Sequence, residues 1–249
     1  MVVEAFSPKK HQVVSRTIIR RAGRFLYKRF STPEIEGIEN IPDEGPYLIT
    51  INHLSVFDPP FVIPFWPVAP TPLGAIELWT ERGKALLTRM YGAIPIDRDR
   101  YDRSALERVV LTLQSGIPIL MAPEGRITRV PGLRRAKLGV AYILEKARVP
   151  VLPVGIVGGT PDFLERALRG KKPAIKMRVG LPYNLPYEKV LQFSKKEAYQ
   201  VLADYVMAKV AAVLPEDYRG FYCEYDRFTQ LLDLPMVSND EKYSRQNSD

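Results

Sequence analysis

The fold is decided by the run YLITIN at residues 47–52, which is followed directly by HLSVFD at residues 53–58. Aliphatic, β-branched and aromatic residues dominate the first run and Gly45-Pro46 precedes it, so the run predicts a buried β-strand. In open α/β sheets, ligands bind beyond the carboxyl ends of the strands. The polar residues from His53 to Asp58 therefore occupy a position where a functional site is expected.

Strand and helix patterns alternate along the rest of the chain. Short apolar runs predict strands at residues 93–96, 117–121, 151–157 and 175–179, with a strand and turn at 35–42. Periodicity and capping signals predict helices at residues 79–90, 102–115, 134–146 and 194–214, with capping boxes at Ser104–Glu107 and Ser194–Glu197. This alternation is typical of α/β proteins. We predict a single α/β domain with a mixed, largely parallel central sheet flanked by helices, and an N-terminal amphipathic helix.

The net charge of the chain is concentrated near its N-terminus. The 249 residues include 36 lysines and arginines and 28 aspartates and glutamates, which gives a net charge of +8. Residues 5–33 contain no acidic residue, and their basic residues equal this excess: Lys9, Lys10, Arg16, Arg20, Arg21, Arg24, Lys28 and Arg29. The sequence therefore describes a neutral body that carries a basic N-terminal arm.

Composition excludes several classes of protein. With 46% hydrophobic and 26% charged residues, the chain is not intrinsically disordered and can form a sizeable core. Its single cysteine, Cys223, excludes an internal disulfide and a multi-thiolate metal site, and we expect no bound metal. Residues 59–76 carry no charge but include six prolines, each of which costs about 3 kcal/mol inside a helix. This stretch is therefore not expected to span a membrane.

The arm has the pattern of an amphipathic helix. Val14, Ile18, Ala22 and Phe25 recur at helical spacing, and basic residues occupy most of the remaining face. Such helices are typical of docking on an anionic membrane surface, where each basic residue contributes roughly 1 kcal/mol. Two alternatives are a helix packed on the body with a solvated basic face, and a nucleic-acid-binding arm. No nucleic-acid motif accompanies the arm, so we predict membrane docking and no nucleic-acid partner.

His53 and Asp58 form a candidate pair of a base and the group that orients it. A carboxylate beside a histidine fixes the imidazole tautomer and stabilises the imidazolium, although a purely structural histidine is equally compatible with the pattern. No nucleophile accompanies the pair, because Ser55 lacks a glycine-flanked elbow and Cys223 is remote in sequence. If His53 is a base, it activates a hydroxyl of the substrate. The chemistry would be acyl or phosphoryl transfer to an alcohol, without a covalent enzyme intermediate.

Two further polar clusters follow predicted strands. Asp97-Arg98 comes after the strand at 93–96, and Glu124-Gly125-Arg126 comes after the strand at 117–121. Arginine side chains bind phosphate well, although each cluster could equally be a salt bridge that closes a loop. Because three polar clusters each follow a strand, a shared site is favoured over three separate bridges.

Four blocks of the sequence resemble the glycerolipid acyltransferases. Asn52-His53 and Asp58 match the NHxxxxD block, and residues 92–98 resemble the second block. Residues 123–125 resemble the third block, usually written PEGTRS, and residues 149–154 resemble the fourth. All four occur in order with similar spacing across roughly residues 35–160. Within the family, the chain is most similar to the 1-acylglycerol-3-phosphate (lysophosphatidate) acyltransferases.

The resemblance implies an activity and a site. The family's catalytic histidine and aspartate fall on His53 and Asp58, and its acceptor-phosphate contacts fall on Arg98, Glu124 and Gly125. It implies that His53 deprotonates the free hydroxyl of lysophosphatidic acid. The oxygen then attacks the thioester of acyl-CoA or acyl-carrier protein, which gives phosphatidic acid. No cofactor is implied beyond this acyl donor.

The third block departs from the family pattern. Ile127 stands where the family has arginine, and Arg126 or Arg129 could take its place. Lys137 matches a basic position that often follows this block. The acceptor therefore stays open between lysophosphatidic acid and another lyso-lipid or glycolipid. A non-catalytic membrane-binding protein with the same fold is a further alternative.

These patterns divide the chain into three parts. Residues 1–32 are predicted to form the basic membrane-docking helix, residues 33–234 the acyltransferase catalytic domain, and residues 235–249 a polar, disordered tail. We expect a peripheral membrane protein on the cytoplasmic face of the cell membrane. The proline-rich residues 59–72, with their aromatic side chains, could line an acyl channel or belong to the core.

Overall fold

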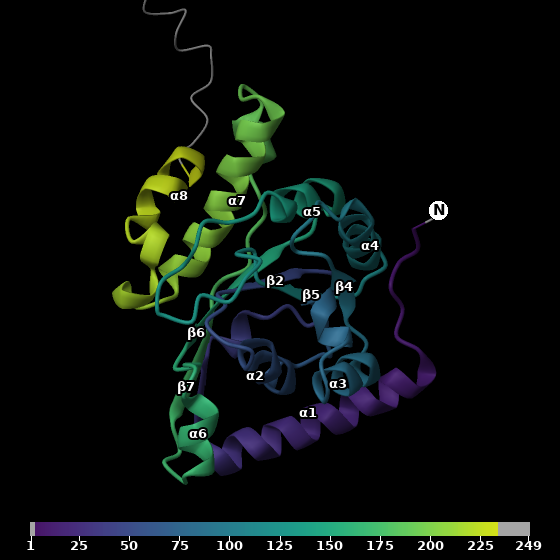
Figure 1. Cartoon of the computed structure of the whole chain (residues 1–249). Helices are drawn as coiled ribbons and strands as arrows, with labels where there is room; N and C mark the ends of the chain where they lie inside the picture. Colours follow the sequence, from purple (N-terminus) through teal and green to yellow (C-terminus); the bar gives the residue numbers. More distant parts are fainter. Residues whose placement is uncertain (1–2, 234–249) are drawn as a thin grey trace, which may run out of the picture.

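The computed structural model describes residues 3–233 and has a seven-stranded sheet at its centre (Figure 1). The strand order is β1-β7-β6-β2-β5-β3-β4, and every pairing is parallel except that of β6 with β7. The strands are β1 (Thr32–Glu36), β2 (Leu48–Ile51), β3 (Thr71–Ala75), β4 (Ile94–Ile96), β5 (Ile119–Met121), β6 (Val151–Val157) and β7 (Ala174–Val179). The predicted α/β fold with a mixed, largely parallel sheet is confirmed.

Eight α-helices surround the sheet within the described part of the chain. They are α1 (Lys10–Phe30), α2 (Asp58–Phe65), α3 (Lys84–Tyr91), α4 (Arg103–Gln114), α5 (Gly139–Ala147), α6 (Phe163–Leu168), α7 (Lys195–Ala212) and α8 (Tyr225–Asp233). Short 3-10 turns lie at Ile38–Asn40, Ile76–Trp79, Tyr187–Val190, Glu216–Tyr218 and Gly220–Tyr222. None of the helices within residues 3–233 is long and apolar enough to cross a membrane.

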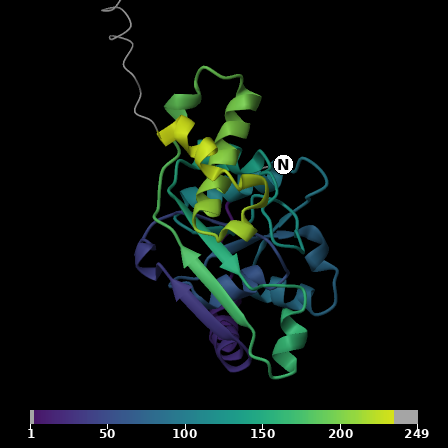
Figure 2. The same ribbon diagram turned by 90° about the vertical axis from the view of Figure 1, so that its left-hand side faces the viewer.

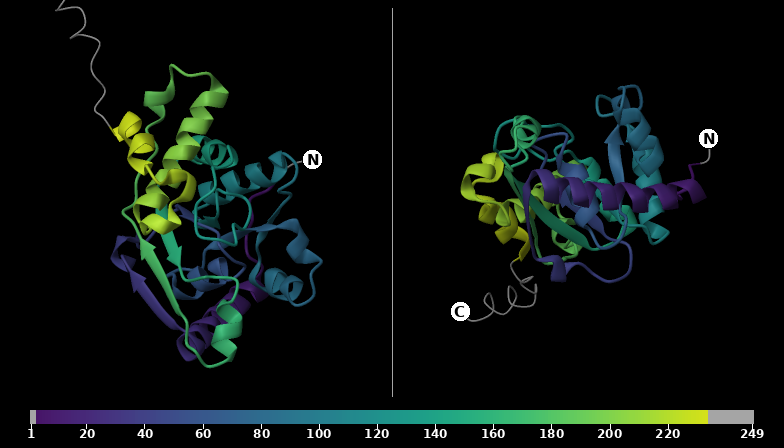
Figure 3. Two further views of the ribbon diagram at one scale, coloured as in Figure 1. Left: turned by 60° about the vertical axis from the view of Figure 1, so that its left-hand side comes forward. Right: turned by 90° about the horizontal axis from the view of Figure 1, so that it is seen from below.

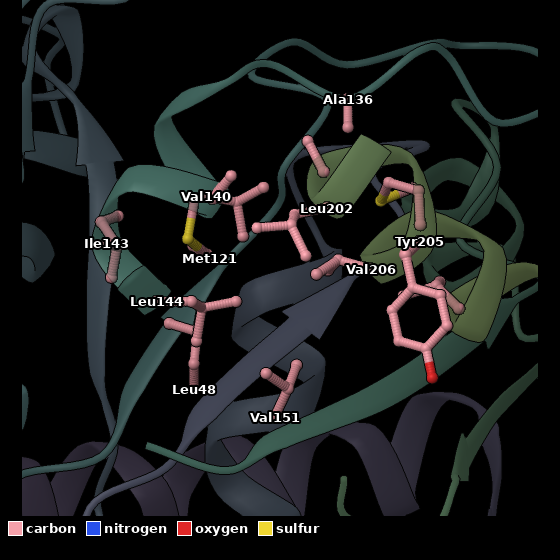
Figure 4. Close-up of a cluster of buried hydrophobic side chains, with 14 of the residues drawn as sticks. Leu48, Met121, Ala136, Val140, Ile143, Leu144, Val151, Leu202, Tyr205 and Val206 are labelled. Carbon is pink, nitrogen blue, oxygen red and sulfur yellow. The ribbon is translucent and has the colours of Figure 1, made fainter. Parts of the chain in front are cut away.

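Alternation along the central strand divides the core into two layers. Leu48 of β2 packs with the cluster formed by α4, α5 and α7, part of which is drawn in Figure 4. Ile49 and Ile51, one and three residues further along, belong to the other cluster, which α2 covers. Successive side chains of a strand point to opposite faces, so a strand apolar throughout is buried on both sides. The sheet is therefore sandwiched between helices, as the buried run at 47–52 requires.

The proline-rich stretch contains two elements that its sequence did not reveal. Residues 58–65 form α2, because Pro59 and Pro60 occupy the first turn, where backbone N–H groups have no partner inside the helix. Residues 71–75 form β3, which pairs with β4 and β5. Phe61 and Trp66 are fully buried in the core. Their burial agrees with the core alternative for this stretch.

Several predicted helix boundaries were wrong. The helix expected at 79–90 begins only at Lys84, after a turn at Gly83, where φ is 81°. The helix expected at 134–146 begins at Gly139. Asp102, not Ser104, caps α4, because its side chain accepts a hydrogen bond from the Ala105 backbone N–H. The capping box at Ser194–Glu197 is present as expected. The polar tail from residue 235 lies outside the described residues.

Helix α1 packs on the body with its polar face and exposes its apolar stripe. Gln12, Ser15 and Arg16 are buried, whereas Ile18 and Phe25 are 61% and 67% exposed. Other exposed apolar side chains of this helix are Val13, Val14, Leu26 and Phe30. Figure 2 views the helix nearly end on beneath the sheet, and Figure 3 shows it crossing the lower side of the molecule. The helix does pack on the body, as one alternative for the arm proposed. Its basic face is only partly solvated, because several arginines point inward.

The inward arginines satisfy carbonyl groups at the ends of two other helices. Arg16 donates to the carbonyls of Tyr91 and Gly92 at the end of α3. Arg20 donates to the carbonyls of Ile63, Trp66 and Pro67, and Arg24 to that of Pro64, at the end of α2. The last carbonyls of a helix lack partners inside it, and cations are favoured there. Part of the arm's charge thus serves the fold.

Candidate active site

The site lies at one edge of the sheet, where parallel strands end together. His53 follows β2, Glu124 follows β5, Gly159 follows β6 and Arg98 follows β4. Because β6, β2, β5, β3 and β4 run parallel, their carboxyl ends meet at this edge. The position agrees with the general rule for ligand sites in α/β sheets. Three polar clusters of the sequence therefore share one edge of the fold.

His53 and Asp58 are in direct contact. Nδ1 of His53 lies 3.0 Å from Oδ2 of Asp58, and the same oxygen accepts the backbone N–H groups of Leu54 and Ser55 at 2.7 Å each. Asp58 is fully buried, whereas the His53 side chain is 15% exposed. An ionised carboxylate can only accept hydrogen bonds, so the proton of this contact belongs to Nδ1. Nε2 is then left as the free proton acceptor.

Glu124 holds the backbone of His53 instead of facing solvent. It is 4% exposed, and its Oε1 accepts the His53 N–H at 2.9 Å. Its Oε2 accepts the Thr128 hydroxyl at 3.0 Å and the Arg134 N–H at 2.8 Å. The Thr128 N–H in turn donates to the carbonyl of His53 at 2.9 Å. Both backbone groups of His53 are therefore clamped by the loop after β5.

Burial and hydrogen bonds shift the pKa of the Glu124 carboxyl in opposite directions. Burial raises the pKa of its carboxyl, and the backbone hydrogen bonds from Arg134 and His53 partly offset that rise. Both oxygens of the Glu124 carboxylate already have protein partners. The observed geometry therefore gives this side chain the role of holding the loop that carries His53. The resemblance to the acyltransferases implies a phosphate contact for Glu124, and that role stays a prediction.

Asn52 and Gly159 support the site in ways that the sequence did not show. The Asn52 amide exchanges two hydrogen bonds with the backbone of Ile156, at 2.7 and 2.8 Å, and so ties the end of β2 to β6. At Gly159, a Cβ atom would stand 2.5 Å from Oδ1 of Asp58 and 3.4 Å from the Ser55 hydroxyl. Only glycine leaves room for the buried carboxylate. The asparagine is visible in the motif, but the glycine lies about a hundred residues further on.

Replacing Gly159 with alanine is expected to lower the rate of the reaction without unfolding the protein. The added methyl group must displace the Asp58 carboxylate, and misplacing a catalytic group by about 1 Å costs about 100-fold in rate. The measurement is kcat alongside the melting temperature. Gly74→Ala is the matched control, because Gly74 also lacks a positive φ and no atom lies closer than 3.4 Å to its Cβ position. A kcat within about twofold of wild type for Gly159→Ala would contradict the steric argument.

A shallow basic cavity lies at the loop after β5 that bonds to His53. Its volume is about 300 Å³, and it is lined by Arg98, Asp99, Arg126, Ile127 and Arg129. Arg126 forms an ion pair with Asp99, so the loops after β4 and β5 meet here. Ile127 and Arg129, which line the cavity, flank Thr128, and the backbone N–H of Thr128 donates to the carbonyl of His53. Arginine forks of this kind suit a phosphate group.

Lys137 and Gly125 shape the wall of this cavity. Nζ of Lys137 donates to the carbonyl of Arg98 at 2.8 Å, and its side chain passes so close to Gly125 that a Cβ there would stand 2.9 Å away. Gly125 also has a φ of 71°, which disfavours other residues. Neither Gly125 nor Lys137 lines the cavity itself. Both hold together the two loops that do.

The predicted salt bridges coexist with the shared site. Arg98 lies 3.5 Å from Glu77 and Arg126 contacts Asp99, and all four side chains are at least 30% exposed. Exposed pairs of this kind contribute at most about 1 kcal/mol. Both arginines can therefore exchange these partners for a more highly charged anion. Among residues 3–233, no group of three or more His, Cys, Asp or Glu side chains is placed to hold a metal ion.

Comparison with known proteins identifies the family of the chain. Residues 32–157, about half of the chain, match the family described as Acyltransferase. The chain therefore belongs to the acyltransferase family. It also shares its fold with PlsC, the 1-acyl-sn-glycerophosphate (LPA) acyltransferase of Thermotoga maritima, known from a crystal structure. That match has a TM-score of 0.60 and 22% sequence identity, and it covers 81% of this chain and 80% of that one.

Proposed function

We propose that this acyltransferase moves a fatty acyl group from acyl-CoA or acyl-carrier protein to the free hydroxyl of lysophosphatidic acid, giving phosphatidic acid. The observation that carries the proposal is the contact between His53 and Asp58, together with the hydrogen bond from Thr128 that joins His53 to the loop of a cavity lined by three arginines. A base supports transfer to a hydroxyl, and the arginines support an acceptor with a phosphate. The shared fold with a 1-acyl-sn-glycerophosphate acyltransferase agrees with this assignment.

The proposed reaction proceeds without a covalent enzyme intermediate. Nε2 of His53 removes the proton of the acceptor hydroxyl as its oxygen bonds to the thioester carbonyl carbon. Asp58 keeps the imidazole in the required tautomer and stabilises the imidazolium that forms. The carbon–sulfur bond then breaks, and the sulfur leaves with the proton that His53 had taken. The products are an ester and a free thiol, and the histidine returns to its neutral form.

Arg129 is proposed to replace the arginine that the third block lacks. Ile127 has no charge, whereas Arg129 lines the same cavity two residues away. Its backbone has a φ of 62°, a left-handed conformation that costs a non-glycine residue roughly 1–2 kcal/mol. Residues in strained conformations cluster at active sites and ligand-binding sites. Together with Arg98 and Arg126, Arg129 gives the cavity an excess of positive charge for a phosphate.

Replacing Arg129 with glycine is expected to raise KM for lysophosphatidic acid about tenfold, because one charge-assisted bond to phosphate is lost. The left-handed backbone suits glycine, so the melting temperature should be retained. The test measures KM for lysophosphatidic acid and for monoacylglycerol, which lacks the phosphate. Lys172→Gly is the control, since Lys172 has a φ of 41° outside the cavity. An equal change with both acceptors would show that Arg129 does not bind phosphate.

The acceptor screen also separates the proposal from its alternatives. Preference for another lyso-lipid or a glycolipid would keep the chemistry and change the substrate. Absence of thiol release from acyl-CoA with every acceptor would favour a non-catalytic membrane-binding protein. The close His53–Asp58 contact speaks against that last alternative, because it leaves Nε2 of His53 free to accept a proton, as a general base requires.

The membrane is proposed as the place of the reaction, and α1 as the contact with it. Its outward apolar side chains are 37–67% exposed, and Lys10, Arg21, Lys28 and Arg29 are exposed beside them. An apolar face bordered by basic residues is typical of helices that lie in the bilayer interface. The cytoplasmic face of the cell membrane, where acyl-CoA and acyl-carrier protein occur, is the proposed location.

A further inference from the structure

Helix α1 touches the catalytic loop at one polar contact. The hydroxyl of Tyr27 donates to the backbone carbonyl of Phe57 at 3.1 Å. Phe57 is the N-cap residue of α2, and Asp58 is the first residue of that helix. The contact therefore joins the proposed membrane helix to the residue next to the aspartate of the active site.

The aromatic ring of Tyr27 also packs against residues at the first turn of α2. The Tyr27 ring lies 5.1 Å from that of Phe61 and 6.1 Å from that of Phe163, between ring centres. Phe163 in turn lies 5.8 Å from Phe57. Helices α1, α2 and α6 thus meet in one aromatic cluster around the N-terminal turn of α2. Rings at these separations stabilise one another by about 0.5–1.5 kcal/mol per pair.

Asp58 depends on the position of this turn. Its side chain reaches back to accept hydrogen bonds from residues 53–55, so a shift of the first turn of α2 moves the carboxylate away from His53. The Tyr27 hydroxyl is in place to resist such a shift. Burial raises the pKa of Tyr27 and the nearby charge of Asp58 raises it further, so the hydroxyl keeps its proton and remains a donor.

We infer that Tyr27 is a positioning residue for acyl transfer, which holds the first turn of α2 through the Phe57 carbonyl and so keeps Asp58 against His53. The inference rests on the proposed function, since it assigns Tyr27 a part in the same reaction. It gives α1 two roles on opposite faces. The outward face contacts the bilayer, and the inward face supports the catalytic loop.

The experiment compares Tyr27→Phe with Tyr91→Phe. Tyr91 is also a buried helical tyrosine whose hydroxyl donates to a backbone carbonyl, that of Pro70 at 3.0 Å, but Pro70 lies outside the catalytic loop. Each variant loses one hydroxyl and keeps its ring, so both should lose similar stability. Tyr27→Phe is expected to lower kcat about tenfold with KM within about twofold of wild type. Tyr91→Phe should leave kcat unchanged.

A second measurement does not depend on activity. The Nδ1 proton of His53, hydrogen-bonded to Asp58, gives a downfield NMR resonance that is easily assigned, because the chain has only two histidines. Tyr27→Phe should shift or broaden this resonance, and Tyr91→Phe should not. An unchanged resonance, or equal losses of kcat in both variants, would overturn the inference. If His53→Ala remained active in the same assay, the proposed function would fail instead.

Discussion

Replacing His53 with alanine is expected to lower kcat for acyl transfer by about 1000-fold, because the reaction then lacks its base. The other basic side chains near the site, those of Lys137 and the arginines, are hydrogen-bond donors and offer no acceptor nitrogen. The assay follows release of free thiol from acyl-CoA in the presence of lysophosphatidic acid. This is the largest effect on catalysis that we expect from any single substitution in the chain.

The substitution should leave the fold intact. Among the described residues, the His53 side chain bonds only to Asp58, whose Oδ2 keeps the backbone N–H groups of Leu54 and Ser55 as partners. The backbone clamp by Glu124 and Thr128 does not involve the imidazole at all. The melting temperature is therefore expected to change by only a few degrees.

His11→Ala is the matched control for this prediction. It removes the other histidine of the chain, which is exposed on α1, and should leave kcat unchanged. If His53→Ala kept more than about a tenth of the wild-type kcat, His53 would not be the general base. A loss of both activity and folding would instead assign His53 a structural role, the alternative that its sequence context left open.

The sequence was most informative about the parts of the candidate site whose residues lie close together along the chain. The five-residue spacing of His53 and Asp58 indicated a candidate pair, and the two residues meet because the loop between them turns directly into the first turn of α2. The run at 47–52 predicts a buried strand, and β2 lies in the middle of the sheet. The place of the site follows from the rule for strand ends.

The contributions of Tyr27 and Gly159 could not be predicted in this way. Each meets the loop at residues 53–58 through tertiary packing, Tyr27 from α1 and Gly159 from the loop after β6, and neither local sequence shows a sign of it. The basic cavity is an intermediate case. Arg98 and Arg126 were identified by their positions after predicted strands, but the pairing of Arg126 with Asp99 depends on two loops that meet only in the folded chain.

Helix α1 shows why periodicity alone can mislead. A stripe of apolar residues usually faces the core, and the packing alternative for the arm assumed so. In this protein the carbonyl groups at the ends of α2 and α3 lie against α1, and they require donors. Arg16, Arg20 and Arg24 provide them, at spacings of four residues along one face. The apolar stripe is therefore turned outward, and the packing face was set by hydrogen bonding.

This orientation changes what membrane docking should depend on. An arm that acted only as an electrostatic tether would use all of its basic residues, but three arginines are engaged by the body. Burial even lowers the pKa of Arg16 below its ordinary value, which reflects how far it is removed from solvent. Binding should therefore rest on insertion of the apolar face, and the exposed basic residues should add a preference for anionic lipid.

Replacing Ile18 and Phe25 together with serine is expected to weaken vesicle binding by about 30- to 700-fold. Each side chain is roughly two-thirds exposed, so its transfer into lipid should contribute about 1–2 kcal/mol, or about 2–4 kcal/mol for the pair. The point variants are preferable to deleting residues 1–30, because deletion would also remove the donors for α2 and α3. Cosedimentation with neutral and anionic vesicles measures the effect.

Leu181→Ser with Leu191→Ser is the matched control, since these leucines are 73% and 80% exposed away from α1. The control should bind vesicles as wild type does, and both double variants should keep the wild-type melting temperature because no buried contact is lost. If the Ile18 and Phe25 variant still bound anionic vesicles fully, the basic residues alone would hold the protein to the membrane. If it lost binding to both kinds of vesicle, the apolar face of α1 would be the main contact, as its exposure requires.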